Sequence, residues 1–159
     1  MLNCLEEPFN YKKTMKKDKV IVEKIFNVNA KQAWLALTNN EHLQKWYFQL
    51  ADFKAKVGFK FDFTGGPDDG PHYLHLCEVV EVIEEKKIAY TWLYDNYPGN
   101  SLVCWEIIDK GEQVLIRITH TGLETFEENG ENFTAASFTA GWNYFVHEAL
   151  NTYLEAKYG

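Results

Sequence analysis

The sequence predicts an α+β fold in which a curved antiparallel sheet wraps around a long C-terminal helix. Residues 72–122 hold several stretches rich in β-branched and aromatic residues, separated only by turn-forming segments. Residues 134–156 form one long stretch with helical periodicity. Two shorter helical stretches, 29–39 and 41–48, directly follow the first strand candidate at 19–28. Strands joined by short turns pair antiparallel, and the long helix is then needed to cover one face of the sheet.

The first strand and the first helix meet at Asn29. KVIVEKIFNV, residues 19–28, contains β-branched residues in partial alternation with polar ones, which is typical of a strand. Asn29 is a good N-cap, because its side-chain oxygen can accept a hydrogen bond from the first turn of a helix. Ala33, Trp34 and Leu37 then share one helical face. EHLQKWYF, residues 41–48, is predicted as a second short helix or turn.

The middle of the chain is predicted as a succession of short strands. ADFKAKV (51–57) and FKFDFT (59–64) are strand candidates on either side of Gly58, and GGPDDGP (65–71) is a turn. Four more strand candidates follow, at 72–85, 86–95, 101–110 and 112–122. The apolar phase of the first of these shifts near Val79 and Val80, which predicts a bulge or a strong bend there.

The last predicted helix carries far more aromatic bulk than a solvent-facing helix needs. Thr134 is its expected N-cap. The residues that recur at helical spacing are Phe138, Trp142, Phe145, Ala149 and Tyr153. We expect this stripe to lie across the antiparallel sheet.

Length and composition indicate one domain. The chain has 159 residues, of which 46% are hydrophobic and 16% aromatic. We expect residues 1–18, which lack a clear hydrophobic period, to be a mobile tail, and residues 19–159 to form a single domain. The formal net charge of −7 argues against a nucleic-acid partner, because phosphate contacts need clustered cations.

Cysteine usage and hydropathy indicate the cytoplasm. Cys4, Cys77 and Cys104 show no CxxC spacing and cannot all pair, so we expect three free thiols in a reducing compartment. No run of about 18 apolar residues occurs, so no membrane span is expected. The first 19 residues contain no apolar leader segment.

Three blocks of the sequence resemble a known family. They are EVVEVIEEKKIAYTW (78–92), LVCWEIIDKGEQVLIRITHTGL (102–123) and AGWNYFVHEALNTYLE (140–155), with the motifs TW, HTG and GW in that order. These blocks resemble the C-terminal domain of Aha-type activators of the heat-shock protein 90 ATPase and its bacterial single-domain relatives. The family belongs to the START-like, or SRPBCC, superfamily, which includes birch-pollen-allergen-like proteins. The resemblance covers residues 19–157 and implies the helix-grip fold, with two short helices after the first strand.

The resemblance also implies an apolar cavity between the long helix and the sheet. The aromatic residues expected to line it are Trp46, Tyr73, Tyr90, Trp92, Trp105, Phe138, Trp142 and Phe145. The alternative is that these side chains only fill the core. Two functions follow: binding of a small hydrophobic or aromatic molecule, or a protein-interaction module that binds the chaperone. We favour the first, because the aromatic weight falls at the predicted helix–sheet contacts.

The sequence gives weaker support to catalysis. No GxSxG stands at a strand-to-helix turn, and the five histidines lack metal-ligand spacing, so no metal or other cofactor is expected. A cyclase- or hydrolase-type enzyme would need an ionisable group inside the cavity. His75, Glu78 and Glu106 are the candidates, although a solvent-facing strand position is the simpler explanation for each. We expect the protein not to be an enzyme.

Overall fold

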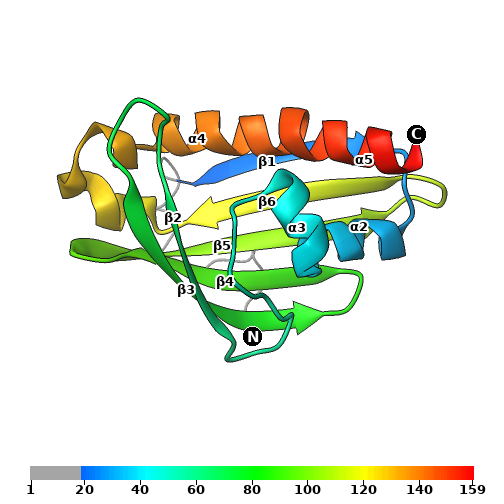
Figure 1. Ribbon diagram of the computed structural model, residues 1–159, viewed down its shortest axis with the longest axis horizontal. Helices are drawn as coiled ribbons and strands as arrows, with labels where there is room; N and C mark the ends of the chain where they lie inside the picture. The colour runs from blue at the N-terminus through cyan, green and yellow to red at the C-terminus, as the bar shows by residue number, and fades with distance from the viewer. Residues whose placement is uncertain (1–18) are drawn as a thin grey trace.

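One antiparallel sheet and one long helix make up the body of the protein (Figure 1). The computed structural model describes residues 19–159, so the prediction of a mobile tail at 1–18 lies outside the described residues. Six strands form the sheet in the order β1-β6-β5-β4-β3-β2. Their bounds are Val20–Phe26 (β1), Lys60–Gly65 (β2), Tyr73–Ile83 (β3), Lys87–Tyr94 (β4), Tyr97–Asp109 (β5) and Val114–Thr121 (β6). This is the predicted α+β helix-grip fold.

The helices found within residues 19–159 pack on one face of the sheet and share one core with it. The helices are α2 (Ala30–Thr38), α3 (Asn40–Trp46), the 3₁₀ segments η1 (Leu123–Asn129) and η2 (Glu131–Phe133), and the long C-terminal helix, made of α4 (Ala135–Asn143), η3 (Tyr144–Leu150) and α5 (Asn151–Tyr158). Figure 1 shows the long helix running along the sheet, with α2 and α3 beside its C-terminal half. Side chains from both groups of helices join the strands in one buried cluster.

The predicted cap at Asn29 is confirmed. Its side chain accepts a hydrogen bond from the backbone N–H of Gln32 at 2.8 Å, and the Gln32 side chain accepts one from the Asn29 N–H at 3.0 Å. This reciprocal pair satisfies two N–H groups that the first turn of a helix cannot satisfy by itself. Asn39 caps α3 without a reciprocal bond, because its side chain accepts from the N–H groups of Glu41 and His42.

The prediction of a strand at 51–57 is wrong. The segment pairs with no strand, and the Lys56 N–H bonds to the Lys54 carbonyl two residues back. Phe53 is buried against Phe61, but Val57 is 58% exposed. The alternation of the sequence therefore reflects one anchoring aromatic residue rather than a face of the sheet.

The predicted bulge in the third strand is confirmed. The register of β3 against β4 shifts between Val79 and Glu81. A bulge of this kind increases the local twist and bends the strand, which helps the sheet curve around the helix.

The long helix contains a π-helical segment, η3, which the sequence did not predict. The buried side chains of the whole long helix recur at every fourth residue: Phe138, Trp142, Val146, Leu150 and Leu154. Four residues exceed one α-helical turn by roughly 40°, so such a stripe would rotate away from the sheet along an uninterrupted α-helix. The wider turns of the π-helical segment, with hydrogen bonds spanning five residues, compensate for this rotation.

The π-helical segment moves the buried stripe by one residue relative to the prediction. Ala149 and Tyr153 were expected on the buried face with Phe145, but all three are only partly buried. Val146 and Leu150 occupy the core instead. As a result, the Phe145 ring is left at the edge of the core, where it contributes to the site described below.

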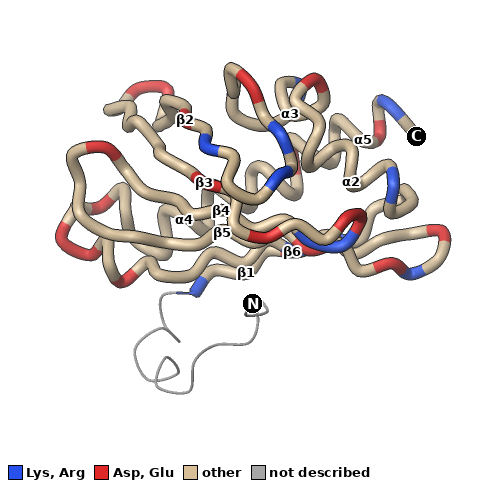
Figure 2. Tube along the Cα trace, turned by 90° about the horizontal axis from the view of Figure 1, so that it is seen from below, with Lys and Arg blue, Asp and Glu red and all other residues tan. Residues whose placement is uncertain are grey.

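The opposite face of the sheet is more polar and is crossed by ion pairs. Arg117 on β6 forms a salt bridge with Glu23 on β1, with 2.8 Å between Nη2 and Oε2. Figure 2 shows basic and acidic residues interspersed along the described chain, with many of the acidic ones on loops. Within residues 19–159, none of the helices combines the length and apolar character that a membrane span requires.

The cysteine prediction needs a correction. Cys77 is a free thiol buried on β3. Cys104 is disulfide-bonded, so the expectation of three free thiols is wrong for this residue. Cys4 lies outside the described residues.

Candidate functional site

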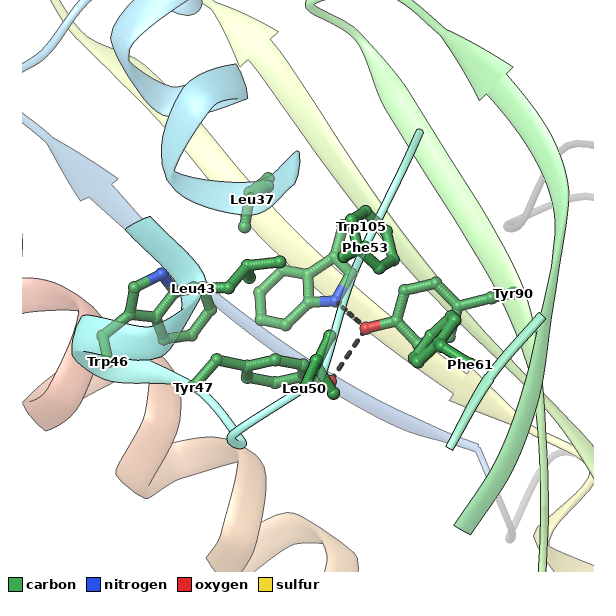
Figure 3. Close-up of a pocket in the computed structure, with 9 residues that line it drawn as sticks. All are labelled: Leu37, Leu43, Trp46, Tyr47, Leu50, Phe53, Phe61, Tyr90 and Trp105. Atoms are coloured by element: carbon green, nitrogen blue, oxygen red, sulfur yellow. Dashed lines mark hydrogen bonds between the residues drawn. The ribbon is translucent and has the colours of Figure 1, made fainter. Parts of the chain in front are cut away.

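Two aromatic regions lie between the helices and the sheet. The first, here called the closed compartment, lies under α3 and has no space for a water molecule. Figure 3 shows its side chains converging from α2, α3, the following loop and three strands. They are Leu37, Leu43, Trp46, Tyr47, Leu50, Phe53, Phe61, Tyr90 and Trp105.

The polar atoms of the closed compartment bond to one another. The Trp105 Nε1–H donates to the Tyr90 hydroxyl at 3.0 Å, and the hydroxyls of Tyr47 and Tyr90 lie 2.8 Å apart (Figure 3). Burial raises the pKa of both tyrosines, so both stay neutral. The Trp46 Nε1–H donates to the Ala36 carbonyl at 2.9 Å. This region is therefore a satisfied and filled part of the core.

The second region, here called the open groove, has a volume of about 560 Å³ and opens to solvent. It lies between the N-terminal half of the long helix and the ends of β2, β3 and β4. Its lining residues are Phe48, Gly65, Gly66, Pro67, Tyr73, His75, Trp92, Tyr94, Asn132, Ser137, Phe138, Ala140, Gly141, Trp142, Tyr144 and Phe145. A volume of this size falls in the range of small-molecule sites, roughly 300–1,000 Å³.

Aromatic rings form the floor of the open groove. Trp92 on β4 and Trp142 on α4 meet at a centroid distance of 5.3 Å, so the helix is in contact with the sheet at the bottom. Phe48 packs on Phe145 at 4.8 Å and on Phe63 at 4.3 Å. These rings separate the groove from the closed compartment.

Small residues keep the open groove open. Gly65 ends β2 and Gly66 follows it on one side, and Ala140 and Gly141 lie on α4 on the other. A Cβ atom at Gly65 would lie 2.8 Å from the Phe48 ring, so this position needs glycine for the present packing. A Cβ atom at Gly141 would meet no atom within 4 Å, so a larger side chain there has room to enter the groove.

His75 is the ionisable group held deepest in the open groove. The residue is only 5% exposed. Its ring stacks on the Phe63 ring at a centroid distance of 4.4 Å, and its centroid lies 4.6 Å from that of the Tyr94 ring. Its Nδ1 lies 2.9 Å from the Tyr73 carbonyl. A carbonyl only accepts, so Nδ1 carries the proton. Burial lowers the pKa of His75 to about 4, so the ring is neutral near pH 7.

A second neutral histidine, His120, lies behind the floor of the groove and is fully buried. Trp142 Nε1–H donates to its Nδ1 at 3.1 Å, and its Nε2 lies 2.8 Å from the Ser101 hydroxyl. That hydroxyl donates to the Trp92 carbonyl at 2.7 Å, so Nε2 must be the donor to Ser101. Burial lowers the pKa of His120 to about 3. His120 thus ties the long helix to the sheet.

The structure divides the predicted cavity residues between the two regions. Five of the eight, Tyr73, Trp92, Phe138, Trp142 and Phe145, line the open groove. The other three, Trp46, Tyr90 and Trp105, line the closed compartment. The sequence could not separate these groups, because aromatic residues at buried positions fill a core as readily as they line a cavity.

The three acid–base candidates do not meet. His75 lies on the inner face, in the groove. Glu78 and Glu106 follow the opposite alternation of β3 and β5 and are half-buried on the other face. The Glu106 Oε1 atom is buried with no hydrogen-bond partner in the described part of the chain. The arrangement therefore brings neither glutamate to His75.

Sequence reasoning missed three aromatic residues of the open groove, Phe48, Tyr94 and Tyr144. The alternation of Tyr90, Trp92 and Tyr94 along β4 was visible, and it would have placed Tyr94 on the inner face beside Trp92. Phe48 lies in the irregular segment after α3, where no period indicates its direction. Within residues 19–159 no cluster of three or more His, Cys, Asp or Glu side chains could hold a metal ion.

Comparisons with known proteins agree with the fold. A protein from Mesorhizobium loti has 25% identity and a TM-score of 0.71, covering 87% of this chain and 97% of that one. A Chromobacterium violaceum protein has 14% identity and a TM-score of 0.72 with the same coverage. An HSP90 activator from Plasmodium falciparum has 17% identity and a TM-score of 0.63, covering 87% of this chain and 95% of that one. No curated protein matches in sequence.

The family assignment rests on the sequence itself. The profile of the family described as "Activator of Hsp90 ATPase homolog 1-like protein" matches residues 27–155, which is most of the described chain. The chain therefore belongs to the family of Activator of Hsp90 ATPase homolog 1-like proteins, within the START-like superfamily.

Proposed function

We propose that this protein binds a small hydrophobic or aromatic molecule in the open groove. The observation that carries the proposal is the contrast between the two aromatic regions. The closed compartment holds no water-sized space, whereas the groove keeps about 560 Å³ free beside rings of the same kind. Emptying such a groove of water on binding is favourable, by roughly 25 cal/mol for each Å² of apolar surface buried.

The family membership supports a second candidate function, a protein-interaction module that acts on the chaperone. The family takes its name from chaperone activation, and one structural neighbour is an HSP90 activator. Exposed apolar side chains at Ile21 and Ile25 on the edge strand β1 offer contact area for a protein. This candidate predicts binding to the middle segment of the chaperone and a rise in its ATP turnover.

Other expectations from the sequence stay as proposals with less support. A cyclase- or hydrolase-type activity has less support, because the candidates Glu78 and Glu106 lie on the other face of the sheet from His75. The net charge of −7 supports the expectation of no nucleic-acid partner. The cytoplasm remains the proposed location.

Tryptophan fluorescence gives a direct test of the binding proposal. Trp92 and Trp142 line the groove, so a bound aromatic compound should change their emission saturably. The same compound should raise the melting temperature, because a ligand that binds only the folded state stabilises it by mass action. If a broad panel of neutral aromatic compounds produces neither signal, while the chaperone's ATP turnover rises, the interaction module is the correct function.

A blocking variant identifies the groove as the place of binding. Gly141→Phe puts a ring into the groove from a position where a Cβ atom meets nothing within 4 Å. We expect it to weaken binding at least tenfold without loss of stability. Ala136→Phe, on an exposed part of the same helix and outside the groove lining, is the matched control and should bind normally. Equal binding by both variants would place the ligand elsewhere.

A further inference from the structure

The hydroxyl of Tyr94 has a proton to donate beside the floor of the open groove. Its oxygen accepts the Trp92 Nε1–H at 2.9 Å. An indole N–H can only donate, so the proton of the Tyr94 hydroxyl must point elsewhere. Burial raises the pKa of Tyr94, so the hydroxyl keeps this proton at neutral pH. Both residues line the groove, and Tyr94 is only 7% exposed.

Within residues 19–159 the protein offers no acceptor for this proton. The bond from Trp92 is the one hydrogen bond that the Tyr94 hydroxyl forms in this part of the chain. The neighbouring His75 ring has its polar contacts with the backbone of Tyr73 and Phe63 instead. The acceptor for the Tyr94 proton must therefore come from what fills the groove, either water or a ligand.

The hydroxyl of Tyr73 adds a second, partly exposed donor. Its oxygen accepts the Asn132 Nδ2–H at 3.0 Å, and the Tyr73 ring meets the Tyr94 ring edge to face at a centroid distance of 6.0 Å. The Trp142 Nε1–H and the Ser137 hydroxyl, by contrast, already donate to other parts of the protein. The hydrogen-bonding capacity left at Tyr73 and Tyr94 is therefore that of donors.

Charge narrows the ligand further. Among the described residues that line the groove none is Lys, Arg, Asp or Glu. A carboxylate or an ammonium group in the groove would lose water without gaining a partner of opposite charge, which is costly in an apolar site. The groove therefore favours a neutral acceptor, such as a carbonyl oxygen.

From these contacts we propose that the ligand is a neutral aromatic molecule whose carbonyl oxygen accepts a hydrogen bond from the Tyr94 hydroxyl. This inference rests on the proposed function, because it specifies the ligand class of the same groove. The aromatic body would lie against the rings of Trp142 and Phe145. A ligand without an acceptor would displace water from Tyr94 and leave a buried donor unpaired, which is unfavourable.

Three probes with one ring system test the proposal by calorimetric titration at pH 7. 2-Acetylnaphthalene carries a ketone, 2-isopropenylnaphthalene has a CH₂ group of similar shape in place of the ketone oxygen, and 2-naphthoate carries an anionic acceptor. We expect the anion to bind at least about tenfold more weakly than the ketone, because the groove supplies no opposite charge. Equal or tighter binding of the anion would overturn the proposal.

Removal of one hydroxyl assigns the hydrogen bond to Tyr94. The comparison is made in Trp92→Phe, where no Trp92 N–H is left to donate in place of the hydroxyl. Adding Tyr94→Phe should weaken ketone binding about 3- to 10-fold, the range of one net hydrogen bond, and hydrocarbon binding less than about twofold. Adding Tyr73→Phe instead is the matched control and should leave the ketone affinity within about twofold. Unchanged ketone affinity without the Tyr94 hydroxyl, in variants shown to be folded by circular dichroism, would exclude this residue.

The infrared carbonyl band of the bound ketone gives a second readout, which needs no change at Trp92. A hydrogen bond to the oxygen should place the band at a lower frequency than in hexane, and the shift should shrink in Tyr94→Phe. A band at the hexane frequency in the unchanged protein would overturn the proposal.

The outcomes separate this inference from the proposed function. If loss of the Tyr94 hydroxyl leaves the ketone affinity unchanged while Gly141→Phe blocks both the ketone and the hydrocarbon, the groove binds aromatic molecules but Tyr94 does not select them. If none of the three probes gives a heat of binding or raises the melting temperature, groove binding itself fails, and this inference fails with it.

Discussion

The closed compartment and the open groove are built from the same kinds of side chain but differ in what surrounds them. In the closed compartment α3 and the loop after it place Leu43, Tyr47 and Leu50 over the rings of Tyr90 and Trp105. At the rim of the groove the residues are small: Gly65 and Gly66 on the strand side and Gly141 on the helix side. The rim, and not the aromatic content, decides which region stays open.

The difference also concerns water. The polar atoms of the closed compartment can bond only to each other, because no water fits. The groove lies open, so water can satisfy any polar atom that a substitution leaves unpaired. Equivalent substitutions in the two regions should therefore have unequal costs, and the predictions below use this asymmetry.

The largest effect is expected for Trp105→Ala in the closed compartment. Trp105 is 2% exposed and contacts Trp46, Tyr47 and Trp142. Removing it leaves a large cavity and should lower the free energy of unfolding by about 3–5 kcal/mol, measured by urea denaturation. Tyr144→Ala, at a 53% exposed position of the groove rim, is the control and should change stability by less than about 0.5 kcal/mol. Similar losses in both variants would mean that the two regions are equally packed.

The second effect is a loss of stability in mild acid. Burial lowers the pKa of His75 to about 4 and that of His120 to about 3, whereas an unfolded histidine titrates near 6.5. Below pH 6.5 the unfolded chain therefore binds protons that the folded protein does not bind. The free energy of unfolding decreases as the pH is lowered. The stability that each neutral histidine contributes is fully present above the unfolded pKa. Lowering the pH from 7 to 5 should reduce the free energy of unfolding by about 2 kcal/mol for each histidine.

Variants separate the two histidines in this pH dependence. Urea denaturation of His75→Phe at pH 7 and pH 5 should show a pH-dependent loss smaller by about 2 kcal/mol than in the unchanged protein. His147→Gln, at an exposed position of the long helix, serves as the control. A loss that is unchanged in His75→Phe would show that the groove histidine is already protonated in the folded state.

Much of this fold could be predicted from the sequence, because local patterns determine it. The capping pair at Asn29 is a side-chain property of four consecutive residues, and the bulge near Val79 showed as a change of apolar phase. The segment 51–57 failed because its alternation reflects one buried aromatic residue, Phe53, while the segment pairs with no strand. Pairing is a property of the whole sheet and cannot be read from one segment.

The candidate site was harder to predict for a related reason. The π-helical segment depends on how the whole helix fits the sheet, and it moved the buried stripe from Phe145, Ala149 and Tyr153 to Val146, Leu150 and Leu154. Whether an aromatic ring fills the core or lines a groove depends on neighbours distant in sequence, as Gly65 and Gly141 show. These relations exist only after folding.

The third prediction applies one chemical change to both regions. Tyr90→Phe removes the hydroxyl that accepts from Trp105 and bonds to Tyr47, and no water can replace it. We expect a loss of about 2–3 kcal/mol in urea denaturation, because buried polar groups are left unpaired. Tyr94→Phe removes the acceptor of the Trp92 Nε1–H beside the open groove. There the loss should be about 1 kcal/mol or less. Equal losses would show that water does not reach the groove floor.

The smallest effect is a gain in stability from Gly141→Ala. Gly141 lies inside α4, where glycine costs a helix about 1 kcal/mol relative to alanine because it loses more backbone freedom on folding. An added Cβ atom meets nothing within 4 Å, so the alanine variant should be more stable by about 0.5–1 kcal/mol in urea denaturation and should still bind the groove probes. Gly65→Ala is the opposite case, since its Cβ atom would lie 2.8 Å from Phe48 and should destabilise the protein. If Gly141→Ala also lowers stability, the helix side of the groove is packed more tightly than the open groove allows, and the contrast between the two regions fails at its rim.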